Sequence, residues 1–211
     1  MPTQAERRAT TRGDLLDAAV ATLCDEGAAG FTVSAVVGRA GLSNGALFRH
    51  FPTRDALLAA TVEEVLALLR TDFDAARATL GDDGVDVHGL VVLLWGVMTD
   101  PRLAAVYDAY AAARTDPALR SAIEPVVRAH VDRLGAVGRE VLTRFPGVDA
   151  DTADRATSLA VMAMQGHVVN ATVLPDEAGA ARLLESLELI AASLLGDGVP
   201  AGEGRPEALP C

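Results

Sequence analysis

The segment TVSAVVGRAGLSNGALFRHF, residues 32–51, decides how this sequence is interpreted. Residues 33–40 and the stretch after Ser43 each carry a helical pattern, and Gly41 separates them. Glycine favours a left-handed helix end, and serine caps the start of a helix. The segment therefore predicts two short helices joined by a tight turn. Such a pair can place its second helix in the major groove of DNA while the first crosses the backbone.

The two sides of this predicted pair differ in chemistry. The apolar residues, expected to pack on the preceding helix, are Val36, Val37, Leu42, Leu47 and Phe51. The residues expected on the exposed side are Asn44, Gly45, Ala46, Phe48, Arg49 and His50. Asn44 and Arg49 can reach base edges, whereas Thr32, Ser43, His50 and Arg54 are better placed for phosphates. A generic helical hairpin has the same periodicity, so this pattern alone leaves both interpretations open.

The rest of the chain predicts further helices and no strand, and thus an all-α fold. Helix starts are indicated by Asp100-Pro101, Asp116-Pro117, Asp149 or Asp151, and Asp176. Pro125 is expected to kink or split the helix that contains it. The nine expected helices cover residues 10–25, 32–40, 43–51, a long stretch from 53, 85–98, two stretches from 101 and 117, 149–173, and 176–195.

Charge is distributed unevenly along the chain. The net charge is −11, but residues 1–55 hold six basic and six acidic residues, so the deficit lies entirely in residues 56–211. The acidic balance disfavours nucleic acid mildly, although binding depends on the local surface. Two cysteines and an N-terminus without an apolar stretch predict a cytoplasmic protein without a membrane partner.

Short motifs follow one another at definite spacings between residues 10 and 60: LLDAA at 15–19, EG at 26–27, FTV at 31–33, AGLS at 40–43, GALFRHF at 45–51 and RDALL at 54–58. In spacing and residue type they resemble the DNA-binding domain of the TetR (tetracycline-repressor) family. Members usually carry Tyr where this chain has Phe48, and Lys where it has Arg54. Phosphate anchoring is therefore expected to depend more on Thr32, Ser43, His50 and Arg54.

The resemblance implies a nine-helix, two-domain architecture: a helix-turn-helix domain at 1–55 and an effector-binding and dimerisation domain at 56–196. Residues 197–211, rich in Gly and Pro, are expected to be a disordered tail. The family pairs its last two helices with those of a second copy. A bundle seam for such a homodimer is predicted at Leu183, Leu187, Ile190 and Leu194. Burial within a monomer is the alternative, whereas a two-fold dimer predicts a palindromic operator on double-stranded DNA.

The resemblance also implies a pocket for a small-molecule effector inside the second domain. The candidates, each of which ordinary core packing would also explain, are Trp95, Met98, Tyr107, Tyr110, Met162, Met164, His167 and Asn170. Aromatic and thioether groups with a few polar atoms are typical of a site for a largely apolar ligand. The expected function is that of a transcriptional regulator, a repressor released from DNA by this effector.

An enzyme and a helical protein without DNA binding are the two alternative classes. No metal-ligand spacing, phosphate loop or nucleophile motif is present, so no catalytic or metal residues, no cofactor and no enzymatic activity are predicted. A helical ligand- or partner-binding protein of the same fold that has lost DNA binding remains the alternative, and the acidic balance favours it.

Overall fold

The computed structural model describes residues 3–80 and 87–195, and within these ranges the chain forms nine α-helices and no strand. The predicted disordered tail at 197–211 lies outside the described residues. The helices are α1 (Gln4–Gly30), α2 (Val33–Ala40), α3 (Asn44–Phe48), α4 (Arg54–Leu80), α5 (Val87–Met98), α6 (Pro101–Ala113), α7 (Pro117–Leu142), α8 (Ala150–Ala171) and α9 (Glu177–Leu195).

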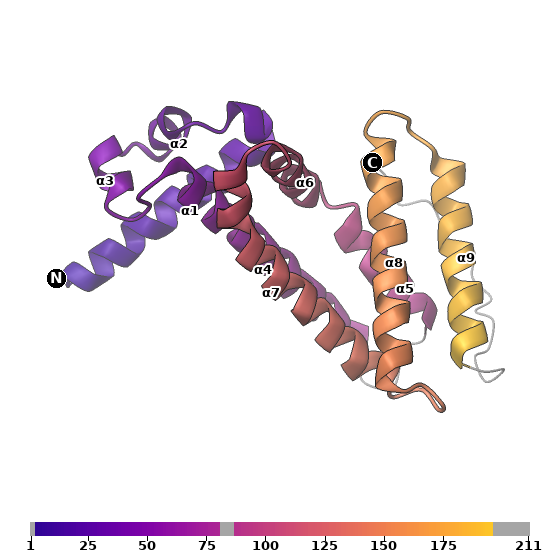
Figure 1. Ribbon diagram of the computed structural model, residues 1–211. Coiled ribbons are helices and arrows are strands. Elements are labelled where there is room, and N and C mark those ends of the chain that lie inside the picture. The colour runs from indigo at the N-terminus through magenta and orange to yellow at the C-terminus, as the bar shows by residue number, and fades with distance from the viewer. Residues whose placement is uncertain (1–2, 81–86, 196–211) are drawn as a thin grey trace.

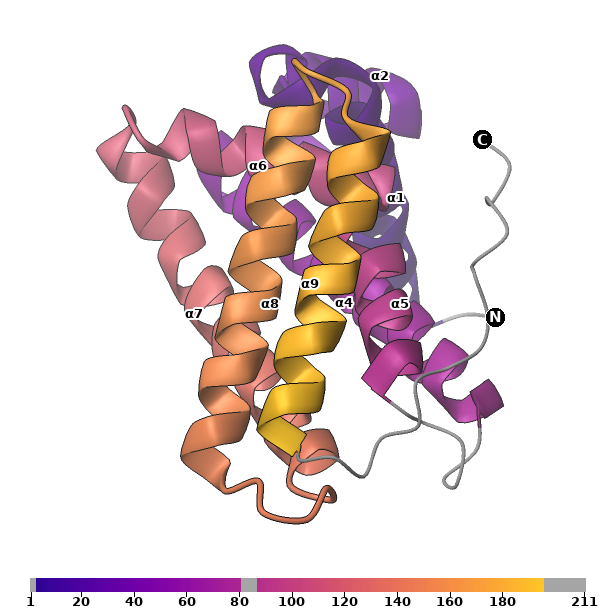
Figure 2. The ribbon, with the colours of Figure 1, turned by 90° about the vertical axis from the view of Figure 1, so that its right-hand side faces the viewer.

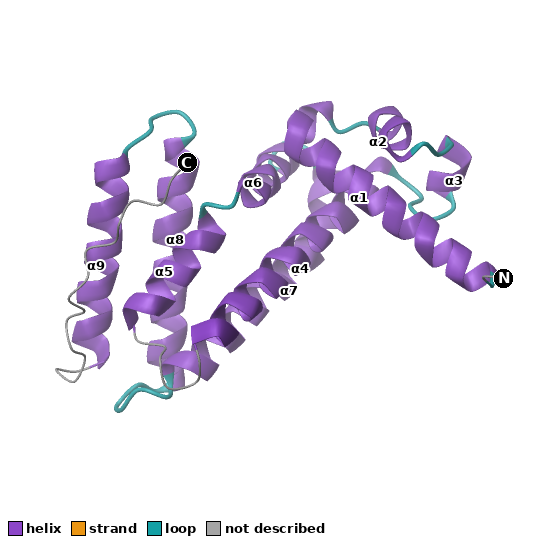
Figure 3. Ribbon diagram, turned by 180° about the vertical axis from the view of Figure 1, so that it is seen from behind, coloured by secondary structure: helices purple, strands orange, loops and turns teal. Residues whose placement is uncertain are grey.

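The helices form two groups that α4 connects. Helices α1–α3 lie at one end of the molecule and α8 and α9 stand side by side at the other (Figure 1). Helix α4 leaves the first group and packs along α7 in the second. Figure 2 shows that α8 and α9 form one outer face. Seen from behind, α6 lies beside α1, which it contacts (Figure 3). The predicted division after residue 55 falls in the first turn of α4.

Local capping signals set most helix starts. The side chains of Asp100, Asp116 and Asp149 each accept backbone N–H bonds from the first turn of α6, α7 and α8. Proline follows at the first helical position of α6 and α7, where its missing N–H costs nothing. The structure confirms these predicted helix starts. They were predictable because each cap depends only on neighbouring residues.

Three helices differ from the expectation. Helix α1 extends from Gln4 to Gly30 rather than over 10–25, and it bends at Gly27, whose φ of 64° few other residues tolerate. Helix α3 is shorter than predicted and ends at Phe48. Helix α7 continues through Pro125, which is exposed, so the predicted split is wrong.

One apolar core runs through both groups of helices. Its largest fully buried side chains include Leu15, Phe31, Leu47, Leu57 and Met164. The two buried hydroxyl groups are satisfied locally, since Thr22 donates to the Ala18 carbonyl at 2.7 Å and Thr61 to the Leu57 carbonyl at 2.8 Å. In the described part of the chain no buried side-chain polar atom lacks a partner.

No single helix of the described ranges is long and apolar enough to cross a membrane. Only α5 and α6 taken together, across a bend of 60°, have the length and composition for it.

Candidate functional site

The turn between α2 and α3 is held by three local features. Thr32 caps α2 by accepting the Ala35 N–H at 3.1 Å, and Ser43 caps α3 by accepting the Ala46 N–H at 3.2 Å. Gly41 ends α2 in the left-handed conformation, with φ of 66°. The hydroxyl groups of Thr32 and Ser43 can still donate a hydrogen bond outward, because only their acceptor capacity is used.

The buried side of this pair is apolar and packs on α1. Val36 and Leu47 are fully buried, and Val37 and Phe51 nearly so. The Arg12 guanidinium of α1 lies over the Phe51 ring, 5.3 Å from its centre. The orientation of α3 is therefore fixed by its contacts with the core.

The opposite side presents the predicted contact residues to solvent. Asn44, Gly45 and Arg49 are exposed, and Phe48 keeps 48% of its surface exposed; Ala46 and His50 are half-buried. Among the described residues Arg49 forms no ion pair or hydrogen bond, so its guanidinium is available to a ligand.

Two basic residues that the sequence reasoning missed lie near this surface. The pKa of His50 is lowered by partial burial and then by the charges of Arg8, Arg12 and Arg49. Arg8 precedes the helix that the sequence predicted at residues 10–25, and Arg12 lies in the first turn of that predicted helix. The capping box at Thr3 and Glu6, which starts the helix earlier than expected, was the sequence signal that could have found them.

Arg54 has a different environment from the one expected of a phosphate contact. Its Nε donates to the Phe31 carbonyl and an Nη atom to the Ala28 carbonyl, both at 2.9 Å. Another Nη atom lies 3.5 Å from the Asp55 carboxylate. The guanidinium thus connects the start of α4 to the last turn of α1 and to Phe31, which follows it. These bonds give Arg54 a structural role, and 37% of its side chain remains exposed.

A cavity of about 180 Å³ lies inside the second group of helices. Its apolar walls include Leu66 and Leu69 of α4, Leu94 of α5, Val137 of α7, Ala160 of α8 and Ile190 of α9. Met98 is the one predicted effector residue in this lining.

The other predicted effector residues lie outside this lining. Trp95 packs its ring against His167, with 5.7 Å between ring centres. Tyr107 and Tyr110 pack together, and burial raises the pKa of each to about 12. Met164 is fully buried.

Two of these candidates, Met162 and Asn170, are exposed on α8. Their residue types were suitable for a pocket, but the rotation of each helix decides which side chains face the cavity.

The residues of the predicted seam on α9 differ in exposure. Leu187 is only 5% exposed within the single chain and Leu183 is half-buried, whereas Ile190 lines the cavity and still keeps 41% of its surface exposed. The side chain of Leu194 lies outside the described residues. Other exposed large apolar residues in α8, just after it and in α9 are Leu159, Met162, Val169, Val173, Leu174 and Leu189.

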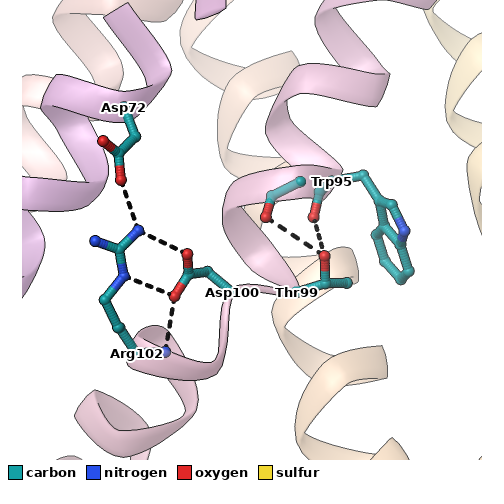
Figure 4. A network of polar contacts seen from close by, with 6 residues as sticks. Asp72, Trp95, Thr99, Asp100 and Arg102 are labelled. Carbon is teal, nitrogen blue, oxygen red and sulfur yellow. Dashed lines mark hydrogen bonds and ion pairs between the residues drawn. The ribbon is translucent and has the colours of Figure 1, made fainter. Parts of the chain in front are cut away.

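A polar network connects α4 to the start of α6 (Figure 4). Arg102 of α6 donates to Asp72 of α4 at 2.6 Å and to both carboxylate oxygens of Asp100, at 2.8 and 3.0 Å. These bonds lower the pKa of Asp100 and raise that of Arg102. Beside them, the Thr99 hydroxyl donates to the Trp95 carbonyl at 2.9 Å. The loop between α5 and α6, next to the cavity, is thereby attached to α4.

Known proteins resemble this chain in both sequence and fold. The family model described as bacterial regulatory proteins, tetR family, matches residues 15–61. An uncharacterised HTH-type transcriptional regulator of Mycobacterium bovis is 29% identical over 177 residues, which are 82% of this chain and 89% of that protein. The HTH-type transcriptional regulator CymR of Pseudomonas putida is 36% identical over 125 residues, 59% of this chain and 62% of its own length.

A likeness in fold extends over nearly the whole chain. The multidrug binding protein EbrR, crystallised with imidazole, superimposes with a TM-score of 0.65 at 22% identity, covering 92% of this chain and 98% of its own. The two sequence relatives are named as regulators and not as enzymes. Residues 15–61 therefore match the family model of bacterial regulatory proteins, tetR family, and most of the chain is similar to an HTH-type transcriptional regulator.

Proposed function

We propose that this regulator is a repressor that binds a palindromic operator as a homodimer and leaves it when a largely apolar effector enters the cavity. The observation that carries the proposal is the course of α4. This helix begins at Arg54 beside the helix-turn-helix and supplies Leu66 and Leu69 to the cavity wall. We keep the division into domains at 1–55 and 56–196 within this proposal.

DNA recognition is assigned to the exposed side of α3. Asn44 suits adenine and Arg49 suits guanine in the major groove. Thr32, Ser43 and His50 are assigned to phosphates, together with Arg8 and Arg12, whose charges act on His50. Gly45 and Ala46 allow close approach, and Phe48 offers an apolar contact.

Dimerisation is assigned to the exposed apolar residues of α8 and α9, which include Ile190 of the predicted seam. Met162 and Leu189 are 69% and 73% exposed in the single chain. Exposed apolar side chains on two helices that lie side by side support an interface with a second copy. We expect Met162→Glu with Leu189→Glu to yield monomers in sedimentation velocity. Val131→Glu, a change at an exposed valine of α7, is the control and leaves the dimer intact.

The switch requires that the effector bind one state of the protein better than the other. A ligand between α4 and the helices opposite it would displace α4 and change the separation of the two recognition helices. The bonds from Arg102 to Asp72 and Asp100 would carry the same displacement to α6, which packs on α1.

The test is binding to the DNA that flanks the chain's own gene, measured at about 50 and 200 mM salt. A dimer that neutralises six or more phosphates loses roughly 1,000-fold in affinity over this range. Asn44→Ala is expected to cost roughly 1–3 kcal/mol of specific binding. Arg49→Ala should relax the preference at one base pair if it reads a base, whereas an equal loss on all sequences would reassign it to a phosphate.

A protein of this fold that has lost DNA binding is the second candidate, favoured by the net charge of −11. It predicts no binding at either salt concentration to any flanking sequence.

A further inference from the structure

Three basic residues form one side of the apolar cavity. Arg70 comes from α4, and His130 and Arg133 come from α7, one turn apart. The same three residues also line a second, polar cavity of about 330 Å³ that lies along α4 and α7. They therefore lie at the boundary between the apolar cavity, called the chamber below, and the polar cavity, called the recess.

The two arginines differ from others on the same helices. Arg77 of α4 pairs with Glu140 at 3.0 Å, and Arg139 of α7 pairs with Asp154. In the described part of the chain, no carboxylate lies within pairing distance of Arg70 or Arg133, although Asp74 lines the chamber and Glu63 and Glu64 line the recess.

The two guanidinium groups at this boundary lie close enough to His130 to affect its pKa. Burial lowers the pKa of His130, and the charges of Arg70 and Arg133 lower it further. His130 is therefore mostly neutral near pH 7 and can share a hydrogen bond with an anion.

The remainder of the chamber offers little else to a polar ligand. Apart from the boundary residues, Asp74 and Thr157 are its only lining residues with polar side chains. A ligand that fills it needs an apolar body, and a single negatively charged group at one end would satisfy the arginines.

We propose that the effector is an apolar molecule with one carboxylate, whose body fills the chamber and whose carboxylate lies between Arg70 and Arg133. This rests on the proposed function, because it assigns the ligand class of the same cavity. Bidentate geometry makes a guanidinium a better partner for a carboxylate than for a hydroxyl group.

The test compares saturated monocarboxylates of six to twelve carbons with primary alcohols and primary amines of the same chain lengths, by isothermal titration calorimetry on the full chain. We expect the best carboxylate to bind at least tenfold more tightly than its alcohol, and the amine to bind weakest. In Arg70→Gln with Arg133→Gln this preference should fall below threefold, while the alcohol keeps its affinity.

Two further variants keep the result interpretable. Arg128→Gln alters an exposed arginine of α7 that pairs with Glu124 outside both cavities, so it should keep the full preference. Arg133→Lys, which retains the charge, should recover part of the carboxylate affinity. Thermal melting of each variant establishes that loss of binding is not loss of folding.

Equal affinity for carboxylate and alcohol, a preference that survives in the double glutamine variant, or no carboxylate binding up to about 5 mM would each overturn the assignment. DNA release is measured separately with the same compounds. If alcohols release the operator as well as carboxylates do, the ligand class fails and the switch stands. If carboxylates bind with the expected preference but leave DNA binding unchanged, the ligand class stands and the switch fails.

Discussion

Replacing Arg54 by methionine distinguishes a structural arginine from one that contacts DNA. Methionine keeps the length of the apolar stem and removes the guanidinium. The change therefore deletes the bonds to the Phe31 and Ala28 carbonyls and the contact of the charge with the Phe31 ring, 5.9 Å from its centre. We expect a less stable protein whose remaining folded fraction binds DNA with an unchanged salt dependence.

The magnitude follows from these contacts. A hydrogen bond from a charged donor contributes about 1.5–3 kcal/mol, so two contribute roughly 3–6 kcal/mol before any correction. Because the Arg54 side chain is 37% exposed, water replaces part of both bonds in the variant. The expected loss in the free energy of unfolding is about 2 kcal/mol, or roughly 4–8 °C in Tm for a chain of this size.

The assay is urea denaturation at one fixed protein concentration, since association with a second copy would make stability depend on concentration. Arg49→Met is the matched control: Arg49 is exposed and without an intramolecular partner among the described residues, so its loss should change stability by less than about 0.5 kcal/mol and weaken DNA binding. The reasoning is refuted if Arg54→Met keeps wild-type stability but lowers the salt slope of DNA binding by about one unit.

Three further changes test other parts of the structure. Gly41→Ala places a Cβ in open space but at φ of 66°, so denaturation should show a loss of about 1 kcal/mol from backbone strain alone; no loss would contradict the left-handed turn. Arg102→Gln removes the bonds to Asp72 and Asp100 and should cost about 1 kcal/mol, detected as a lower Tm; an unchanged Tm would show that water replaces them fully. The pKa of His130 is lowered in the folded protein, so as pH drops below about 6.5 the unfolded chain takes up a proton before the folded chain does, and the free energy of unfolding falls. His130→Gln should reduce this fall between about pH 7.5 and 5.5. An identical fall in the variant would exclude His130 as its source.

The features that sequence reasoning predicted well are those that neighbouring residues determine. Asp100, Asp116 and Asp149 cap the helices that follow them because a carboxylate reaches N–H groups only two or three residues ahead. Gly41 adopts the expected conformation for the same local reason.

Features that depend on distant segments were not predictable in this way. Leu183 and Leu187 repeat with the spacing of a bundle seam, but periodicity cannot say whether the seam faces the same chain or a second one. Arg54 bonds carbonyls more than twenty residues earlier, and no local pattern indicates this. The cavity lining depends on how six helices rotate against one another, so Met98 alone was found among its residues.

Helix α4 has no glycine or proline between Arg54 and Leu80, so it is a stiff rod without a joint. From Arg54 to Leu69 at the cavity it measures about 22 Å, at about 1.5 Å per residue. A tilt of about 5° at Leu69 would move the Arg54 end by about 2 Å, and two copies would add to a change of up to about 4 Å between the recognition helices. A small tilt of α4 caused by a ligand in the cavity thus becomes a larger displacement at the DNA-binding end of the helix. The length of the uninterrupted helix sets the ratio between the two.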